Sequence, residues 1–206
     1  EEFINGFHFL DEHASGKEAS IFGSARFPSS NPHYKEARKL GSLLSKAGFT
    51  IITGGGPGIM EAGNRGAFES GGKSLGLNII LGKEQRTNKY IQDSEVFDYF
   101  FSRKVMLAFA SEVYIFFPGG FGTLDELFEL ITLVQTKKIE PIPIILVGKE
   151  YWSPLLLWIE KELCEKRKTV SKGDLKVYHL VDTAEEAFTL IQEMVGGVKR
   201  EDRKKL

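Results

Sequence analysis

Cysteine is almost absent from this chain of 206 residues, and so is net charge. The single cysteine, Cys164, excludes an internal disulfide, and its place in an apolar-periodic helix at 155–166 favours packing over nucleophilic chemistry. A formal charge of −1 gives no basic field that would attract nucleic acid or an anionic membrane. No apolar run approaches the roughly 18 residues of a membrane span, and no signal peptide is visible. We therefore expect a cytoplasmic protein that binds neither nucleic acid nor membrane.

Several cofactor motifs are also missing. The dinucleotide fingerprint fails because Ile59 stands where its third glycine belongs, which argues against a nicotinamide or flavin dehydrogenase. No lysine lies in a recognisable Schiff-base context, so a pyridoxal-phosphate decarboxylase is disfavoured. The histidines are scattered without ligand spacing, at His8, His13, His33 and His179. We expect neither a metal nor an organic cofactor.

Short apolar runs alternate with helical patterns along most of the chain. The expected strands are Ala19–Gly23, Phe49–Thr53, Ser74–Ile80, Val96–Phe101, 112–117, Ile142–Val147 and Val177–Val181. The expected helices run from Asn31 to Gly48, from Pro57 to about Ser70, over Arg103–Ala110, onward from Gly122, over about Ser153–Lys166 and over Ala184–Val195, with a polar loop at 82–94. Because the strands are continuous apolar runs, helices should cover both of their faces. This pattern predicts an α/β fold with a doubly wound parallel sheet and ligands at the carboxyl ends of its strands.

The most informative segment runs from Pro118 to Glu126, with the sequence Pro-Gly-Gly-Phe-Gly-Thr-Leu-Asp-Glu. It joins a buried strand to a helix through a glycine-rich elbow, which leaves backbone N–H groups free for an anion. Thr123 adds a hydroxyl donor, and Glu126 places a carboxylate within the first helical turn. Thr-x-x-Glu at a helix start is also the pattern of a capping box, so a purely structural role stays open at this point.

Two further segments accompany this elbow. Gly54-Gly55-Gly56-Pro57-Gly58 follows the second expected strand, and Gly23-Ser24 follows the first. Ser102-Arg103-Lys104 puts two cations near a helix start, where the helix dipole normally favours acids. A solvated basic turn would explain the cations, and so would a bound phosphate or the carboxylate of Glu126. Arg103 is the better candidate for a fixed role, because its planar fork orients carboxylates and phosphates.

Together, the segments 54–62, 102–104 and 118–126 resemble the Lonely guy family, whose members are cytokinin riboside 5′-monophosphate phosphoribohydrolases long mislabelled as lysine decarboxylases. The resemblance covers roughly residues 18–195. It implies a Rossmann-like fold, at least a homodimer, and no cofactor. The implied organisation is an N-terminal helical arm at 1–17, a nucleotide-binding catalytic domain at 18–197 and a charged, frayed tail at 198–206.

The resemblance also assigns roles to individual residues. Arg103 and Glu126 correspond to the catalytic pair of the family. The implied phosphate and nucleotide contacts are Ser24, Gly54, Gly55, Gly56, Met60, Lys104, Gly119, Gly120, Gly122 and Thr123. Many relatives carry Gly where this chain has Glu61, so AMP is expected as a substrate as well as, or instead of, a prenylated nucleotide.

The residues themselves suit hydrolysis of an N-glycosidic bond, because a carboxylate can stabilise positive charge on a ribose or activate water. Arg103 is expected to keep Glu126 ionised. Two alternatives stay open. A nucleotide or molybdenum-cofactor carrier would need the glycine elbows but not the Arg103–Glu126 pair, and a DNA-handling protein of the same superfamily would need a more basic surface.

Overall fold

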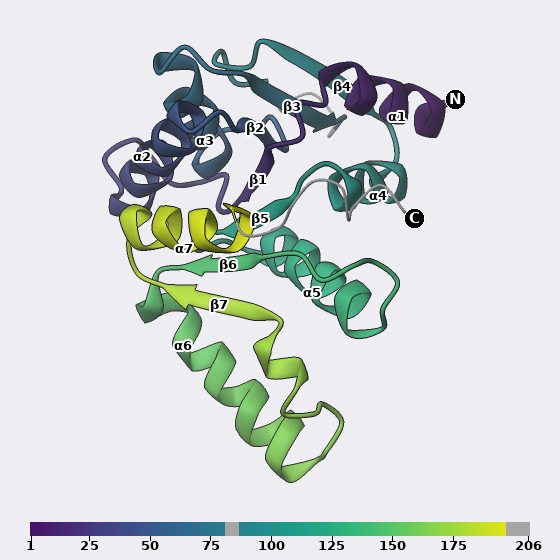
Figure 1. Cartoon of the computed structure of the whole chain (residues 1–206), viewed down its shortest axis with the longest axis vertical. Helices are drawn as coiled ribbons and strands as arrows, with labels where there is room; N and C mark the ends of the chain where they lie inside the picture. Colours follow the sequence, from purple (N-terminus) through teal and green to yellow (C-terminus); the bar gives the residue numbers. More distant parts are fainter. Residues whose placement is uncertain (81–86, 197–206) are drawn as a thin grey trace.

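Seven parallel strands form one sheet in the order β4-β3-β2-β1-β5-β6-β7 (Figure 1). The computed structural model describes residues 1–80 and 87–196. The strands are β1 Glu18–Phe22, β2 Thr50–Thr53, β3 Ser74–Ile79, β4 Asp93–Phe97, β5 Val113–Phe116, β6 Ile144–Val147 and β7 Tyr178–Val181. The order reverses between β1 and β5, and a reversal of this kind opens a crevice at the carboxyl edge of a sheet.

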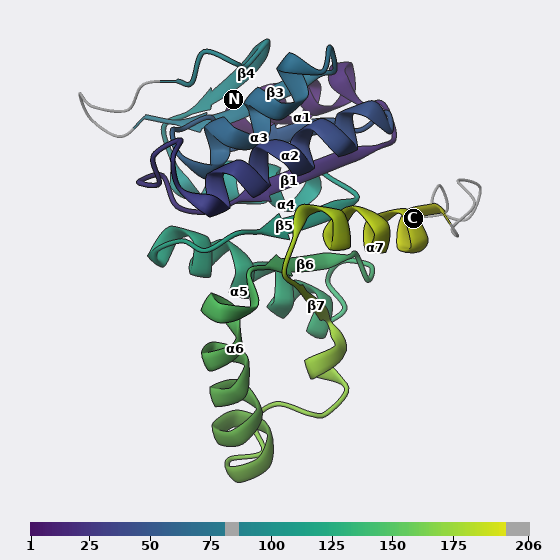
Figure 2. The ribbon, with the colours of Figure 1, turned by 90° about the vertical axis from the view of Figure 1, so that its left-hand side faces the viewer.

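Helices cover both faces of the sheet (Figure 2). They are α1 Glu2–His13, α2 Pro32–Lys46, α3 Ile59–Glu69, α4 Phe100–Phe109, α5 Phe121–Gln135, α6 Lys149–Trp158 and α7 Ala184–Gly196. One core packs α2, α3 and α7 against the sheet, and the other packs α1, α4, α5 and α6 against the opposite face. The doubly wound, Rossmann-like parallel fold expected from the sequence is thereby confirmed.

Burial on both faces explains why the central strands are continuous apolar runs. In β1, Ile21 packs toward α2 and α3, whereas its neighbour Phe22 packs toward α4 and α5. Both side chains are buried, since successive residues of a strand point to opposite faces. A strand with a polar face would leave one of the two helical layers without apolar surface to cover.

The strand expected at Val96–Phe101 is wrong in its position. β4 covers Asp93–Phe97, and the polar loop expected at 82–94 therefore ends earlier, while residues 81–86 lie outside the described chain. β4 is an edge strand, and its ladder to β3 rather than apolar burial holds it, because only Phe97 within it is buried. α4 consequently begins at Phe100, three residues before the expected start at Arg103.

The helix expected at Ser153–Lys166 begins a full turn earlier, at Lys149. Lys149 N–H donates to Oδ1 of Asp182 at 3.0 Å, which satisfies one of the free donors at this helix end. Pro154 lies inside the helix rather than at its first position. From Ile159 to Lys166 the chain continues as a π-helical segment, and Figure 1 shows it extending away from the sheet.

The N-terminal residues form α1, which packs beside β4 and α4. The Glu2 carboxylate accepts hydrogen bonds from Asp98 N–H, at 2.6 Å, and from the Ser102 hydroxyl. Phe9 is buried and belongs to the same core cluster as Phe97 and Met106. The tail expected at 198–206 lies outside the described residues.

Candidate functional site

A cleft of about 850 Å³ opens at the carboxyl edge of the sheet, where the strand order reverses. The loops that follow β1, β2 and β5 meet there with the first turns of α4 and α5. Of the predicted site residues, it gathers Ser24, Gly54, Met60, Arg103, Gly119, Gly120, Gly122, Thr123 and Glu126. Gly55, Gly56 and Lys104 do not line it.

The helix α5 begins in a way that argues against the capping box. Its first residue is Phe121, its N-cap is Gly120, and no side chain caps it. Thr123 is therefore already the third residue of the helix and is not the N-cap that a capping box requires. The N–H groups of the first turn point from an uncapped helix end, where the helix dipole favours an anion.

The three glycines of this elbow serve different purposes. A Cβ at Gly119 would lie 2.0 Å from Oγ1 of Thr123, so the protein itself requires glycine there. A Cβ at Gly120 or Gly122 would meet no atom within 4 Å apart from the adjoining residues and the backbone of its own helix. Their missing side chains leave open space beside the helix start, which is where an anion could approach the backbone.

Ser24 ties the three loops together. Its N–H donates to the Pro118 carbonyl at 3.0 Å, and its carbonyl accepts from Ile59 N–H at 2.9 Å. Its hydroxyl accepts from Arg26 N–H at 3.1 Å. The loops after β1, β2 and β5 thus hold one another in place, and the cleft is formed before any ligand enters.

The second glycine segment contributes one residue to the cleft wall and two to its support. Gly54 lies so close to Arg103 that a Cβ would be 2.2 Å from the guanidinium. Gly55 has φ of +74° and sits against Oδ1 of Asn78, which explains why glycine is needed there. The Asn88 side chain donates to the carbonyls of Gly55 and Gly56, at 3.3 Å and 3.1 Å.

Arg103 is anchored within the first turn and a half of α4. Its Nε donates to the Leu77 carbonyl at 2.7 Å, which fixes the plane of the guanidinium. Burial lowers the pKa of Arg103, and the charge of Glu126 opposes that shift. An arginine nevertheless stays protonated in proteins, so the cleft holds a fixed positive charge.

Glu126 is buried, with 9% of its surface exposed. Burial raises its pKa to about 7, although the charges of Arg103 and Lys104 act in the other direction. The charge of Arg103 favours the ionised carboxylate, as expected, but desolvation is the larger effect and brings the pKa of Glu126 close to neutral pH. A carboxyl group that titrates near neutral pH suits proton transfer.

Lys104 does not line the cleft, although its ion-pair partner Asp125 does. Its Nζ lies 2.8 Å from the Asp125 carboxylate and 3.3 Å from that of Glu129, on the next helix. Although burial opposes it, these contacts raise the pKa of Lys104 and keep it charged. Its part in this structure is to join α4 to α5.

Some residues of the cleft were not found from the sequence. Arg26 and Phe100 line it, and so does Phe121, whose side chain is 91% exposed at the start of α5. Arg26 could have been found from its place two residues after Ser24, behind a strand end. No motif marks Asn88, whose side chain supports the glycine segment by donating to the Gly55 and Gly56 carbonyls.

Comparison with known proteins agrees with this geometry. A family model described as possible lysine decarboxylase matches residues 60–191. A probable cytokinin riboside 5′-monophosphate phosphoribohydrolase of rice is 30% identical over 163 residues, which cover 77% of this chain and 65% of the rice protein. A cytokinin riboside 5′-monophosphate phosphoribohydrolase of Arabidopsis thaliana is 28% identical over 176 residues, 82% of this chain and 79% of that protein.

Solved structures share the fold. The molybdenum cofactor carrier protein of Chlamydomonas reinhardtii superposes with a TM-score of 0.66 at 18% identity, covering 87% of this chain and 98% of that one. A molybdenum cofactor binding protein of Rippkaea orientalis gives a TM-score of 0.61 at 22% identity, covering 86% and 95%. These identities show the fold alone. The matching family model and the curated relatives show that the chain belongs to the Lonely guy family, whose model carries the description possible lysine decarboxylase.

Proposed function

We propose that the protein hydrolyses the N-glycosidic bond of adenosine 5′-monophosphates, releasing the free base and ribose 5-phosphate. The observation that carries the proposal is a buried carboxyl group, Glu126, whose pKa is about 7, one turn inside an uncapped helix N-terminus. An anion site beside a group that titrates at neutral pH fits chemistry on a phosphorylated ribose.

The helix start would hold the 5′-phosphate. Gly120 and Gly122 leave its backbone open, and Thr123 and Ser24 line the same wall of the cleft with hydroxyl groups. Hydrogen bonds to a charged phosphate are stronger than those between neutral groups. Because the phosphate is remote from the bond that breaks, the free energy of binding it would be used to hold the ribose in the reactive orientation.

The bond between C1′ and the base nitrogen would break next to Glu126. The base leaves with the bonding electrons, and positive charge develops on the ribose ring. The ionised Glu126 stabilises that charge or takes a proton from water, whose oxygen bonds to C1′. A proton ends on the released base, so that water is consumed once for each base freed. Arg103, held by the Leu77 carbonyl, would orient the substrate in the cleft.

The deciding experiment measures base release from AMP and from isopentenyladenosine monophosphate. The names of the rice and Arabidopsis relatives point to a cytokinin nucleotide. Glu61, where many relatives carry Gly, accepts a hydrogen bond from the Tyr34 hydroxyl at 2.8 Å and does not line the cleft. This position therefore does not decide which base the cleft accepts, and we expect AMP to be cleaved as well as the prenylated nucleotide. Failure to cleave either nucleotide would refute the proposal.

The alternative is a non-catalytic carrier of a nucleotide or of molybdenum cofactor. Molybdenum cofactor is the group named for the two solved proteins that share this fold. A carrier needs the phosphate-binding elbows but has no use for a buried carboxyl group with a pKa near 7. Tight binding of AMP without any base release would favour the carrier.

We expect that Arg103→Lys retains the fold but loses most of the turnover. Lysine keeps the charge but lacks the planar fork that donates to Leu77 while facing the cleft. The measurement is kcat for AMP, with circular dichroism to check the fold. Arg167→Lys, the same substitution on an exposed cation outside the cleft, is the matched control and should keep full turnover. Full turnover in Arg103→Lys would reduce the role of this residue to its charge.

Prolonged EDTA treatment is expected to leave base release unchanged. In the part of the chain that the structure describes, no group of three or more His, Cys, Asp or Glu side chains could hold a metal ion. Activity that is lost on chelation and restored by a divalent cation would contradict this expectation.

No helix among the described residues is both long and apolar enough to cross a membrane.

We also propose a homodimer or a larger homo-oligomer. Exposed aromatic rings gather where α1 meets α4: Phe3 lies 5.9 Å from Phe101, and Phe7 lies 6.2 Å from Phe109, measured between ring centroids. Such a patch on a soluble protein favours contact with another surface. Light scattering after gel filtration should give at least twice the mass of one chain, and Phe101→Lys should lower it. A monomeric wild-type protein would contradict the proposal.

A further inference from the structure

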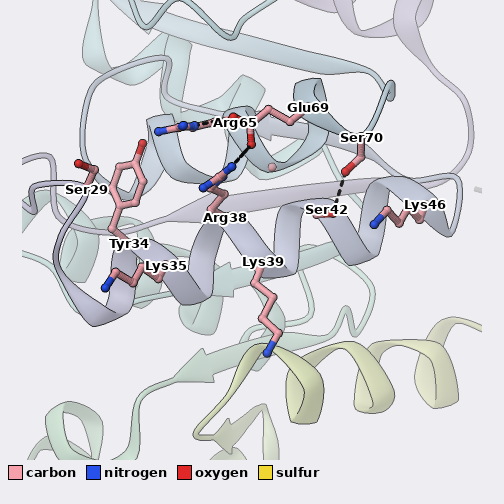
Figure 3. Close-up of a pocket in the computed structure, with 11 residues that line it drawn as sticks. Ser29, Tyr34, Lys35, Arg38, Lys39, Ser42, Lys46, Arg65, Glu69 and Ser70 are labelled. Atoms are coloured by element: carbon pink, nitrogen blue, oxygen red, sulfur yellow. Dashed lines mark hydrogen bonds and ion pairs between the residues drawn. The ribbon is translucent and has the colours of Figure 1, made fainter.

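A second hollow, of about 670 Å³, lies between α2 and α3 and shares no lining residue with the cleft (Figure 3). We call it the α2–α3 groove. It is lined by Ser29, Tyr34, Lys35, Arg38, Lys39, Ser42, Lys46, Arg65, Gly66, Glu69 and Ser70. Five of these residues are cations, whereas Glu69 is the one acid among the described residues that line it. The chain as a whole carries 27 basic and 28 acidic residues, so this local excess of positive charge is not a general property of the surface.

Close helix packing brings two arginines from different helices together. A Cβ at Gly66 of α3 would lie 2.0 Å from the Arg38 carbonyl of α2. A Cβ at Gly41 of α2 would lie 2.4 Å from the Gly63 carbonyl of α3. Any larger residue at Gly41 or Gly66 would push the helices apart. The glycines thus let α2 and α3 lie close enough for an arginine of each helix to bind the same partner.

That partner is Glu69. Nε of Arg38 donates to its Oε2 at 2.7 Å, and Nε of Arg65 donates to its Oε1 at 2.8 Å. Arg65 also lies over the Tyr90 ring, with 5.3 Å between the guanidinium carbon and the ring centroid. Both guanidinium groups are therefore held in place, while one carboxylate cannot use the five N–H donors of each. Figure 3 shows the two arginines and Glu69 together at the centre of the groove.

The flanking charges are only partly compensated. Lys39 pairs with Glu185 of α7, and Figure 3 shows it reaching down to that helix. Lys35 and Lys46 lie at the two ends of the groove and form no ion pair within the described residues. They are eleven positions apart on one helix, which corresponds to roughly 16 Å. This length exceeds what a single phosphate can span.

We propose that the α2–α3 groove binds a small molecule with two or more adjoining phosphate groups, at a site separate from the cleft. The two fixed arginines supply donors at the centre, and Lys35 and Lys46 supply charge at the ends. The hydroxyls of Ser42 and Ser70 are hydrogen-bonded to each other at 2.7 Å, which leaves one of the two O–H groups as a donor between them. The volume suits a small molecule, since ligand pockets measure about 300–1,000 Å³.

The test uses sodium tripolyphosphate as the probe in isothermal titration calorimetry, at an ionic strength of about 0.15 M. The titration is made with ribose 5-phosphate at saturating concentration, so that the phosphate site proposed for the cleft is filled. Under this condition we expect one tripolyphosphate site per chain, and affinity for inorganic phosphate at least about tenfold weaker. The double variant Lys35→Gln, Lys46→Gln should weaken tripolyphosphate binding at least about tenfold. Arg65→Lys should weaken it as well, because lysine keeps the charge but loses the fork.

The matched control is the double variant Lys161→Gln, Lys166→Gln on the distant π-helical segment, which changes the net charge equally. It should bind tripolyphosphate like the wild type. Thr123→Val tests whether the probe sits in the cleft instead and should also leave binding unchanged. Circular dichroism and melting temperature confirm that each variant is folded.

Several outcomes would overturn the proposal. They are no measurable binding, equal affinity for phosphate and tripolyphosphate, equal loss in the control variant, and loss in Thr123→Val but not in the groove variants. A short single-stranded oligodeoxynucleotide that displaces tripolyphosphate and binds more tightly would assign the groove to nucleic acid and would also overturn it. None of these results depends on whether the cleft cleaves AMP.

Discussion

Replacing Glu126 by Gln is expected to slow base release from AMP by at least about a hundredfold, the scale of a lost acid–base group. Glutamine keeps the shape of the side chain in its buried position but cannot carry a negative charge beside the ribose. The loss should appear mainly in kcat, because the phosphate and base contacts stay intact. The measurement is the rate of adenine release at saturating AMP.

The dependence of kcat on pH tests the role of Glu126 in a second way. Because burial raises the pKa of Glu126 to about 7 and the ionised form is the active one, kcat should rise with pH through this value and then level off. The Glu126→Gln variant should lack the rise. A kcat that falls across pH 7 would instead mean that the protonated carboxyl is the active form.

Stability distinguishes a catalytic loss from a folding defect. The pKa of Glu126 is raised from 4.5 to about 7, so between these values the folded chain holds a proton that the unfolded chain releases. Folding stability contributed by this group therefore falls as pH rises through that window. Glu126→Gln should melt no lower than the wild type at neutral pH.

Glu129→Gln, one turn further along α5, is the matched control for the activity measurement and should remain active. Near-normal turnover in Glu126→Gln would refute the assignment.

Removing the 5′-phosphate from the substrate is expected to reduce kcat/KM at least a hundredfold. Charge-assisted hydrogen bonds contribute roughly 1.5–3 kcal/mol each, so the loss of two costs about 3–6 kcal/mol. The donors would be the open N–H groups at the start of α5 and the Thr123 hydroxyl. Part of the effect should appear in kcat, because the phosphate orients the ribose from a distance.

The measurement compares base release from adenosine, AMP and ATP at matched concentrations. ATP should also be cleaved less well than AMP, since the few N–H donors at the start of α5 suit one compact phosphate and leave the charge of the further phosphates unmatched. In Thr123→Val the difference between AMP and adenosine should narrow, because one phosphate donor is gone. If adenosine is cleaved as efficiently as AMP, the helix start is not a catalytic phosphate clamp and the proposed function fails.

The sequence predicted the sheet and most of the cleft because both depend on local patterns. Apolar runs mark strands with two buried faces, and the glycines of the Pro118–Glu126 segment mark the turn from a strand into an uncapped helix start. β4 was misplaced because its ladder to β3, rather than apolar residues, holds it at the edge. Long-range pairing of this kind leaves little trace in a single sequence.

The same distinction applies within the site. The place of Glu126 followed from its motif, but its pKa depends on how completely α4 and α5 exclude water, which no motif specifies. Lys104 was expected near the substrate phosphate because of the family resemblance. Which way its side chain turns depends on Asp125 and Glu129, which come from another helix.

The hydrogen bonds around Ser24 have a consequence for amide exchange. The amide hydrogens of Ser24 and Ile59 are each donated to another loop, to Pro118 and to Ser24 respectively. They should therefore exchange with deuterated solvent slowly, at a rate set by opening of the whole loop assembly. The amides of Gly122 and Thr123, at the free start of α5, should exchange quickly and become protected once a phosphorylated ligand binds. Exchange measured residue by residue would thus distinguish the amides that hold the loops of the cleft together from the amides that are free to bind a ligand.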